Sequence, residues 1–497
     1  MGNYITFPDL LTWLPMLAGL FCFFVVNQKN AKSTAIIFSL LIMGVSIATL
    51  FFTNDAKYLS YNNVNYFWLK YLGANYFIGI DGMGRMLTLL TAIGFPLILL
   101  STVNQEQQNP KAFYGLMMFT QAGLMGVFMA FDALTFYFYW ELALVPVYFL
   151  CSKWGGERRI QATFKFFVYT FAGSLLMLIA ILYVYMHTSS RAIEEGVMIP
   201  HSFSLTAFYN AQLSVTEQNW LFVLFFIAFA IKMPIFPFHT WQPDAYDQSP
   251  TSVTMVLSGL MVKMGLFGVL RWLIPVFPAA SVHYKNIIII LSVIGIVYAS
   301  CIAMMQDNIK RLVAYSSIAH IGLMCAAIFS MNVISIQGVL LQMFDHGINI
   351  IGMWVVVQII ERKTGVKKIS QLSGLAASAP VLTILFIIIA LANIALPLTN
   401  SFTGELLMFT GLFQTSIWFA AIAGIGIILS AVYTLKMIQK VFYGSVNKIT
   451  TEVKDISLQE KLILFFIVGI IFFIGIYPQP LIDLTKESVT NILFRLK

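Results

Sequence analysis

The sequence predicts an all-α, polytopic membrane protein with about fourteen transmembrane helices. Of its 497 residues, 59% are hydrophobic and only 10% are charged, and the mean hydropathy is +0.84. Apolar runs of about 20 residues, the length that crosses a bilayer, recur from one end of the chain to the other. The polar stretches between these runs are too short to fold as a separate soluble domain.

The candidate transmembrane segments follow one another with short gaps. They lie near residues 8–26, 34–53, 85–103, 113–131, 133–151, 164–186, 220–240, 251–274, 287–305, 312–330, 334–360, 380–412, 416–440 and 462–478. No basic residue precedes the first segment, and no small-residue cleavage site follows it. We therefore expect a retained helix, not a signal peptide, and a mature chain that starts near Met1.

The cysteines lie in or at the ends of apolar runs. The four residues are Cys22, Cys151, Cys301 and Cys325, and none has C-x-x-C spacing. This arrangement argues against disulfides, zinc and iron–sulfur clusters in this chain. We expect these side chains to be small apolar packing residues.

Basic residues are distributed unevenly between the connecting loops, although the net charge is +8. Loops after odd-numbered segments contain Lys29, Lys32, Lys111, Lys153, Arg158, Arg159, Lys310, Arg311, Arg362, Lys363, Lys367, Lys368, Lys440, Lys448, Lys454 and Lys461. Loops after even-numbered segments contain chiefly Lys57, Lys70, Arg191 and Lys285. By the positive-inside rule, both termini lie on the periplasmic side of a bacterial inner membrane, and no nucleic-acid partner is needed to explain the charge.

Two of the segments are interrupted at membrane depth. Pro234 and Pro237 lie in the seventh segment, and Pro397 and Gly404 lie in the twelfth. Proline removes a backbone donor and clashes with the preceding turn, so both helices should break. Non-helical backbone at this depth is tolerated where it faces protein or water, so we expect an internal polar path beside each break.

The breaks are about five helices apart, which is typical of transporters built from inverted repeats. We expect helices 1–3 in residues 1–112, a first five-helix repeat in residues 113–274 and a second in residues 287–443. Residues 444–497 then form a fourteenth helix and a tail. The two halves have little similarity residue by residue, so this division rests on the breaks and their spacing.

Ionisable side chains near the middle of apolar segments are the main functional signal. They are Glu141, Lys232, Lys263, His320, Asp345, His346 and Glu405. A single Lys or Asp at the centre of a spanning helix costs roughly 3 kcal/mol on insertion scales. A chain that keeps several of them is predicted to move ions or protons.

Several motifs resemble the antiporter-like subunits of respiratory complex I. They are FYWELALVPVYF at 138–149, WGGERR at 154–159, FFVYT at 166–170, KMP at 232–234, FHTWQPD at 238–244, KRLVAYSSIAHIG at 310–322 and HG at 346–347. The similarity extends from the fourth to the twelfth segment, in one order and spacing. Most of these relatives have Lys in the twelfth segment, whereas the subunit M branch, the equivalent of mitochondrial chain 4, has Glu. Glu405 therefore favours that branch.

The resemblance implies a role for each of these residues. Glu141 and Lys232 are expected to form the first pair and Lys263 to be the central relay. His320 and His346 would bridge the path to Glu405, the terminal exchange residue. Charge control of this kind is plausible because a neighbouring carboxylate favours the ammonium form of Lys, whereas burial favours the neutral form. Arg would not switch, because it stays protonated.

Each position also has a structural interpretation. Glu141 and Lys232 could be a static buried ion pair, and His320 and His346 could be hydrogen-bonded interior histidines. Asp345 departs from the family, which usually has a small residue there, and packing explains it as well as function does. Near the seventh break, Tyr246 stands where the family commonly has a second His. That difference puts a metal or proton role of His239 and Asp244 in doubt.

The chain also lacks the motifs of a redox subunit. Gly82-Met-Gly84 and Gly424-Ile-Gly426 lack the third glycine of a dinucleotide fingerprint and its strand context. NADH, FMN, iron–sulfur clusters and quinone are therefore expected in partner subunits, and this chain is expected to hold no cofactor and no metal. The resemblance implies a proton-translocating subunit of a NADH:quinone oxidoreductase, beside other membrane-arm subunits and neighbouring antiporter-like subunits in the lipid bilayer. The alternatives are a subunit of a multisubunit cation/proton antiporter and a lone transporter for a small solute.

Overall fold

The computed structural model describes residues 5–52, 62–189, 191–192, 198–199 and 201–496. Met1, Lys57 and the side chain of Arg191 lie outside this part of the chain. Within it, the secondary structure is almost entirely helical, which confirms the predicted all-α class. Two antiparallel hairpins are the exception. They pair β1 (Asn63–Leu69) with β2 (Ala74–Gly79) and β3 (Arg191–Ala192) with β4 (Met198–Ile199).

The helices fall into three stretches of the chain. The first contains α1 (Phe7–Phe24), α2 (Ala31–Ala48), α3 (Gly82–Ser101), α4 (Pro110–Met129), α5 (Ala133–Trp154) and α6 (Arg159–Met186). The second contains α7 (Leu205–Tyr209), α8 (Val215–Lys232), α9 (Gln242–Gln248), α10 (Thr251–Val256), α11 (Val262–Gly268), α12 (Ile274–Val276), α13 (Pro278–Met305), α14 (Ile309–Phe329) and α15 (Val333–Thr364). The third contains α16 (Leu375–Ser378), α17 (Pro380–Asn393), α18 (Asn400–Thr415), α19 (Ile417–Phe442), α20 (Lys448–Thr451), α21 (Leu458–Ile476) and α22 (Gln479–Phe494).

Among the described residues, thirteen helices are long and apolar enough to cross a membrane. The stretch Thr251–Val276, which includes α10, α11 and α12, counts as one of them. The twelfth predicted segment is divided into the shorter helices α17 and α18. The chain is therefore a multi-pass membrane protein. The repeat symmetry remains a prediction.

Two helices form the centre of the bundle. The apolar windows of Thr251–Val276 and of α15 are buried along their whole length. A helix that is hydrophobic on most sides belongs in the interior, and both sequences are mainly apolar, although they contain buried ionisable residues that include Lys263, Asp345 and His346. These two buried helices thus contain three of the seven residues of the predicted charged row.

The helix Thr251–Val276 is not regular. It contains two π-helical turns, Leu257–Met261 and Val269–Leu273, with Lys263 between them. A π turn adds one residue and redirects backbone carbonyl groups, and such turns are frequent at functional sites. The sequence contains no signal from which we could have predicted these turns.

Both expected breaks are present. Helix α8 ends at Lys232, and the next helix, α9, begins at Gln242. Helix α17 ends at Asn393, and α18 begins at Asn400. Between them, Ala395 and Leu398 have positive φ angles of 57° and 72°. Left-handed backbone costs a non-glycine residue roughly 1–2 kcal/mol, so surrounding contacts must hold this break in place.

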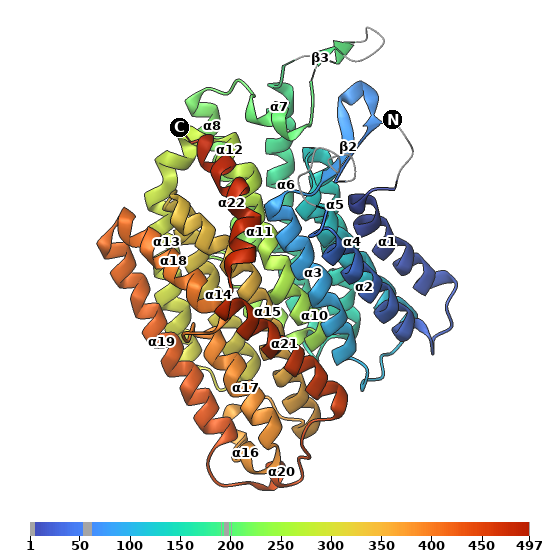
Figure 1. Cartoon of the computed structure of the whole chain (residues 1–497), viewed down its shortest axis with the longest axis vertical. Helices are drawn as coiled ribbons and strands as arrows, with labels where there is room; N and C mark the ends of the chain where they lie inside the picture. Colours follow the sequence, from blue (N-terminus) through green and yellow to red (C-terminus); the bar gives the residue numbers. More distant parts are fainter. Residues whose placement is uncertain (1–4, 53–61, 190, 193–197, 200, 497) are drawn as a thin grey trace.

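Helix α22 extends the carboxyl-terminal segment. It follows α21 after a bend at residues 477–478 and lies across the front of the bundle, where it packs on α3 and α15 (Figure 1). The Ser488 hydroxyl accepts a hydrogen bond from the Met83 amide, and the Gln337 amide donates to the Ile482 carbonyl. Helix α22 ends near the end of the bundle at which α1 begins, and α16 and α20 lie at the other end (Figure 1).

Candidate functional site

The predicted row of ionisable residues is buried within the bundle. Lys263 and Asp345 are fully buried, and Lys232, His320, His346 and Glu405 are at most 8% exposed. Glu141 is partly buried on α5. The other members lie on α8, α11, α14, α15 and α18. The row therefore crosses the bundle from helix to helix and does not run along one helix.

Lys263 and His346 are in direct contact. The Lys263 Nζ lies 2.9 Å from the His346 Nδ1, and it also donates to the Ser258 carbonyl at 3.1 Å. Ser258 lies five residues earlier, inside the first π-helical turn. On the other side of the ring, the His346 Nε2 is 3.3 Å from the Ser317 hydroxyl. This contact can form with the Lys263 ammonium group donating to a neutral imidazole or with a ring N–H donating to a neutral Lys263 amine, so it is compatible with the proton on either residue.

His320 connects this centre to the broken helix. The rings of His320 and His346 lie 5.7 Å apart between centroids. The His320 Nδ1 is 3.2 Å from the Glu405 Oε1 on α18. At this distance an imidazole N–H can donate a hydrogen bond to the carboxylate.

Polar residues that the sequence analysis did not single out surround the His320–Glu405 pair. The Asn393 amide lies 3.4 Å from the His320 Nε2, at the end of α17, and the Gln342 amide lies 3.5 Å from the Glu405 Oε1. Tyr433 on α19 donates to the Ser316 hydroxyl at 2.9 Å. Asn393 could have been found from its position at the break. The others depend on how α15 and α19 pack, which the sequence does not reveal.

Glu141 and Lys232 are neighbours, but no ion pair joins them. Both are among the described residues, and no nitrogen–oxygen pair between them lies within 4.0 Å. The Lys232 Nζ and the Glu141 Oε1 are buried without hydrogen-bond partners. Glu141 still acts electrostatically on Lys232, whose Nζ is 5.4 Å from the centre of the Trp140 ring. The two side chains are thus close to each other in this conformation but form no ion pair.

Lys232 and Lys263 lie on helices that touch. A Cβ on Gly265 of α11 would lie 2.8 Å from the Phe229 carbonyl oxygen of α8 and from the amide of Met233, the residue after α8, so only glycine allows this approach. No hydrogen bond joins the two lysines directly within the described part of the chain. Direct contacts join Lys263 to His346 and His320 to Glu405, His346 and His320 approach each other through their rings, and no hydrogen bond between described residues joins Lys232 to Lys263.

Protein groups donate hydrogen bonds to some of the backbone carbonyls at the first break. The Trp241 indole donates to the Ile231 carbonyl at 3.0 Å, and the Ile235 amide donates to the Ala230 carbonyl at 3.1 Å. The His239 Nδ1 and the Tyr246 hydroxyl are buried and have no partner among the described residues. Neither side chain joins the row.

Asp244, just beyond this break, is an anchor between helices. Its carboxylate accepts from Lys165 on α6 at 2.8 Å and from Arg311 on α14 at 2.9 Å. Burial raises the pKa of Asp244, but the hydrogen bonds and charges of Lys165 and Arg311 outweigh this effect and hold the pKa below its usual value. The residue therefore stays ionised near neutral pH. Its contacts indicate a structural role.

Asp345 points away from the Lys263–His346 contact. It directly precedes His346 on α15, and the side chains of adjacent helical residues point about 100° apart. Neither carboxylate oxygen has a hydrogen-bond partner. Its backbone carbonyl accepts from Asn400 at the start of α18, at 3.4 Å. Asp345 thus faces the broken helix.

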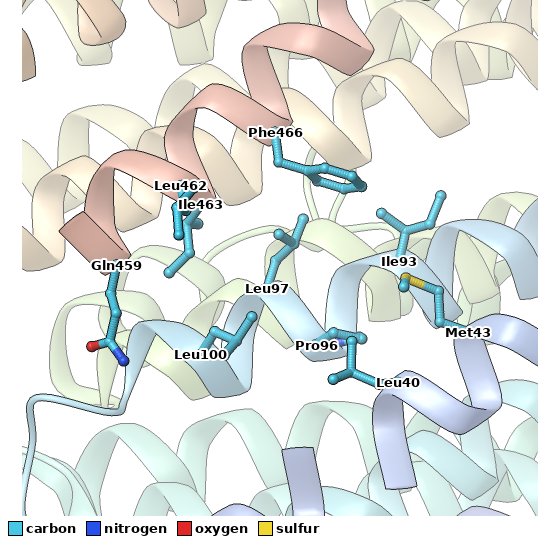
Figure 2. A pocket seen from close by; sticks show the side chains of 10 residues that line it. All are labelled: Leu40, Met43, Ile93, Pro96, Leu97, Leu100, Gln459, Leu462, Ile463 and Phe466. Carbon is cyan, nitrogen blue, oxygen red and sulfur yellow. The ribbon is translucent and has the colours of Figure 1, made fainter. Parts of the chain in front are cut away.

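An apolar cavity of about 330 Å³ lies apart from the row. Figure 2 shows its lining, with Ile93, Pro96, Leu97 and Leu100 on α3, opposite Phe466 and its neighbours on α21 and side chains of α2. The lining contains no ionisable side chain. This cavity fits a hydrocarbon chain and not a polar solute, so it gives no support to a solute transporter.

No metal centre is evident in the described part of the chain. No group of three or more His, Cys, Asp or Glu side chains is arranged there to hold an ion. The histidines of the row contact a lysine and a carboxylate instead.

Comparisons with known proteins agree on one family. A family model described as NADH:quinone oxidoreductase/Mrp antiporter, TM, matches residues 130–430. NADH-quinone oxidoreductase subunit M from Rickettsia typhi is 34% identical over 500 residues, covering 98% of each chain. A chain of respiratory complex I from Thermus thermophilus with bound NADH has a TM-score of 0.89 and 27% identity, covering 98% of this chain and 99% of that chain. A chain of the Mrp complex from a Dietzia species has a TM-score of 0.84 at 17% identity and covers 98% and 97%, which shows a shared fold alone.

Proposed function

Because the chain belongs to the NADH-quinone oxidoreductase subunit M family, we propose that it translocates protons in the membrane arm of that complex through its buried charged row. The observation that carries this proposal is the contact series Lys263–His346–His320–Glu405. It contains a direct contact of 2.9 Å, a ring spacing of 5.7 Å and a second contact of 3.2 Å. A static bundle gains nothing from so many desolvated charges, whereas a proton path requires them.

Lys263 is the loading site. While its ammonium group donates to the His346 Nδ1, the proton is held at the centre of the bundle. Transfer to the ring breaks an N–H bond on Lys263 and forms one on His346, and the positive charge moves to α15. Lys263 then becomes neutral, which its burial favours.

His320 and Glu405 are the release site. A positive charge on His346 repels a proton on His320, because the two rings are close and little water screens them. The proton on His320 then passes to Glu405 across the 3.2 Å contact and reaches the break between α17 and α18. Non-helical backbone there gives the proton polar groups through which to leave.

The Glu141–Lys232 pair couples this path to its surroundings. In this conformation Lys232 has no direct counter-ion, so a small movement of Glu141 toward it or away from it changes its charge state. A change in the charge of Lys232 then acts electrostatically on Lys263 of the adjacent helix. Moving one proton against 100 mV costs about 2.3 kcal/mol, which quinone reduction elsewhere in the complex supplies.

The remaining expectations follow from the family. NADH, FMN, iron–sulfur clusters and quinone belong to partner subunits, and neighbouring membrane-arm subunits contact this chain within the bilayer. Helices α4–α12 form the first repeat and α13–α19 the second. The end with the basic loops faces the cytoplasm and both termini face the periplasm, an orientation supported by the common end of α1 and α22 (Figure 1).

The variant Lys263→Ala tests the proposal in the assembled complex. We expect proton pumping to fall at least about tenfold and coupled quinone reduction to fall with it, because the loading site is gone. Assembly should stay near normal. Lys440→Ala, which removes an exposed lysine from α19, is the control and should pump normally. Unchanged pumping in Lys263→Ala would refute the proposed path.

The family model also covers cation/proton antiporters, so this activity is the second candidate. Subunit M relatives align along nearly the whole chain at 34% identity, which favours the first candidate. Co-purification of the chain with flavin and iron–sulfur subunits would further support the first candidate. Sodium-dependent exchange without NADH oxidation would support the second.

A further inference from the structure

One face of α15 presents oxygen atoms that have no donor within the described part of the chain. Gln342, Asp345 and Asn349 lie at helical spacing and form the α15 acceptor strip. The Gln342 Oε1, both carboxylate oxygens of Asp345 and the Asn349 Oδ1 are buried and unpartnered. Buried acceptors are normally hydrogen-bonded, so this concentration in one place requires protons or water.

The strip faces the start of α18. The Asn349 amide donates to the Asn400 Oδ1 at 3.0 Å and to the Ser401 hydroxyl at 2.9 Å. At the other end of the strip, the Gln342 amide lies 3.5 Å from the Glu405 Oε1. The strip therefore runs beside the broken helix and ends at the release site.

Asp345 is the titratable group of the strip, and its surroundings favour the protonated form. It is fully buried, and no basic group among the described residues lies within ion-pair distance of 4.0 Å. An isolated buried carboxylate would cost several kcal/mol, so the group keeps a proton. The nearby titratable groups are His346, which faces Lys263, and Glu405, whose partner is His320.

We propose that Asp345 is a further proton-carrying residue of the path and that it shares one proton with Glu405. This inference rests on the proposed function and extends it to a group outside the Lys263–Glu405 series. While His320 is charged, Glu405 stays a carboxylate and the proton resides on Asp345. Glu405 then takes the proton of His320 and releases it at the break, which leaves its carboxylate beside a neutral His320. The Asp345 O–H bond now breaks, a water molecule on the strip accepts that proton and passes one of its own to the Glu405 carboxylate, and Asp345 becomes the carboxylate. Gln342 is the positioning residue between the two acids.

Asp345→Asn tests the proposal in the assembled complex, because Asn keeps the size and neutrality of the protonated acid but cannot release a proton. We expect assembly to stay normal and pumping to fall at least about fivefold. The matched control is Asp307→Asn, which removes an exposed carboxylate in the loop before α14. A purely structural Asp345 would tolerate the change, so full pumping in Asp345→Asn would overturn the proposal.

Two further measurements keep the outcome decisive. Infrared spectra of the unmodified complex and of Asp345→Asn are compared during turnover. Their difference should contain the carbonyl band of a protonated carboxyl group, which shifts in D₂O, and absence of this band would overturn the proposal.

If Asp345→Asn does not assemble, Gln342→Met is the deciding variant, because it leaves Asp345 in place and removes the polar side chain between Asp345 and Glu405. It should lower pumping similarly, and normal pumping would overturn the proposal.

Lys263→Ala, measured in parallel, separates the two levels of inference. Loss of pumping in Lys263→Ala with full pumping in Asp345→Asn refutes the role of Asp345 and leaves the proposed function intact. Full pumping in both variants refutes both.

Discussion

Glu405 lies where the buried row meets the broken helix, and it contacts both His320 and Gln342. In the proposed path, its carboxylate accepts the proton of His320. A base at this position would repel the imidazolium form of His320. The sign of the side-chain charge at this position therefore matters as much as the ability of the side chain to bind and release a proton.

Glu405→Lys should lower the number of protons moved per electron, because His320 loses its acceptor and faces a second positive charge. We expect the pumping rate to fall about tenfold or more, while NADH oxidation by the peripheral subunits persists. The measurement is the proton-to-electron ratio in vesicles. Glu452→Lys, at an exposed position after α20, is the matched control and should leave the ratio unchanged. An unchanged ratio in Glu405→Lys would exclude an exchange role.

The sequence predicted the members of this row but not their contacts. Buried charge is visible in a sequence because Lys263 or Glu405 interrupts an apolar run. The contact between Lys263 and His346 depends on the packing of α11 against α15, and the contact with Ser258 depends on a π-helical turn. Periodicity cannot reveal either feature.

Helices α15 and α18 pack closely enough to exclude side chains at glycine positions. A Cβ on Gly338 would lie 2.8 Å from the Gly404 carbonyl oxygen, the Leu407 Cβ and the Met408 amide. Two of these atoms belong to backbone and cannot rotate away. This contact holds the break and the acceptor strip in register.

Gly338→Ala should therefore destabilise the subunit by about 1–3 kcal/mol, because α15 and α18 must move apart. Thermal unfolding of the purified complex measures the effect. Gly424→Ala on α19 is the control, since a Cβ there meets nothing within 4 Å. Alanine should preserve or raise stability at that position. Equal stability of the two variants would contradict the tight α15–α18 contact.

Long apolar helices and proline breaks could be predicted from the sequence, because their physical causes are local. The boundaries of α8 and α18 fall beside Pro234 and Pro397 as expected. The β1–β2 hairpin and α22 were not predicted. Helix α22 is amphipathic and too polar to be a transmembrane segment, and only its packing on α3 and α15 explains its position.

At the scale of the whole molecule, Asp244 joins elements that are distant in the sequence. Its carboxylate binds Lys165 of the first proposed repeat and Arg311 of the second. The two halves of the chain thus meet at an ion-pair cluster beside the first break. This cluster resists relative movement of the two halves.

Asp244→Asn should lower stability near neutral pH by less than about 1 kcal/mol, since the side chain is 38% exposed. The ion pairs lower the pKa of Asp244 in the folded state, so their contribution is complete above the unfolded pKa of about 4 and is lost as the pH falls through the lower folded value. Thermal unfolding at several pH values should therefore find the largest deficit near pH 7 and none in strong acid. A deficit independent of pH would contradict this account, and Asp483→Asn, at an exposed site on α22, is the control.

The position of α22 has a consequence for biogenesis. Residues 479–494 are synthesised after every other helix of the bundle, yet they cover α3 and α15 and bond to Met83 and Gln337. Until they emerge from the ribosome, helix α22 cannot cover these surfaces of α3 and α15. Membrane insertion can proceed helix by helix, but this part of the bundle closes only after residues 479–494 have been made.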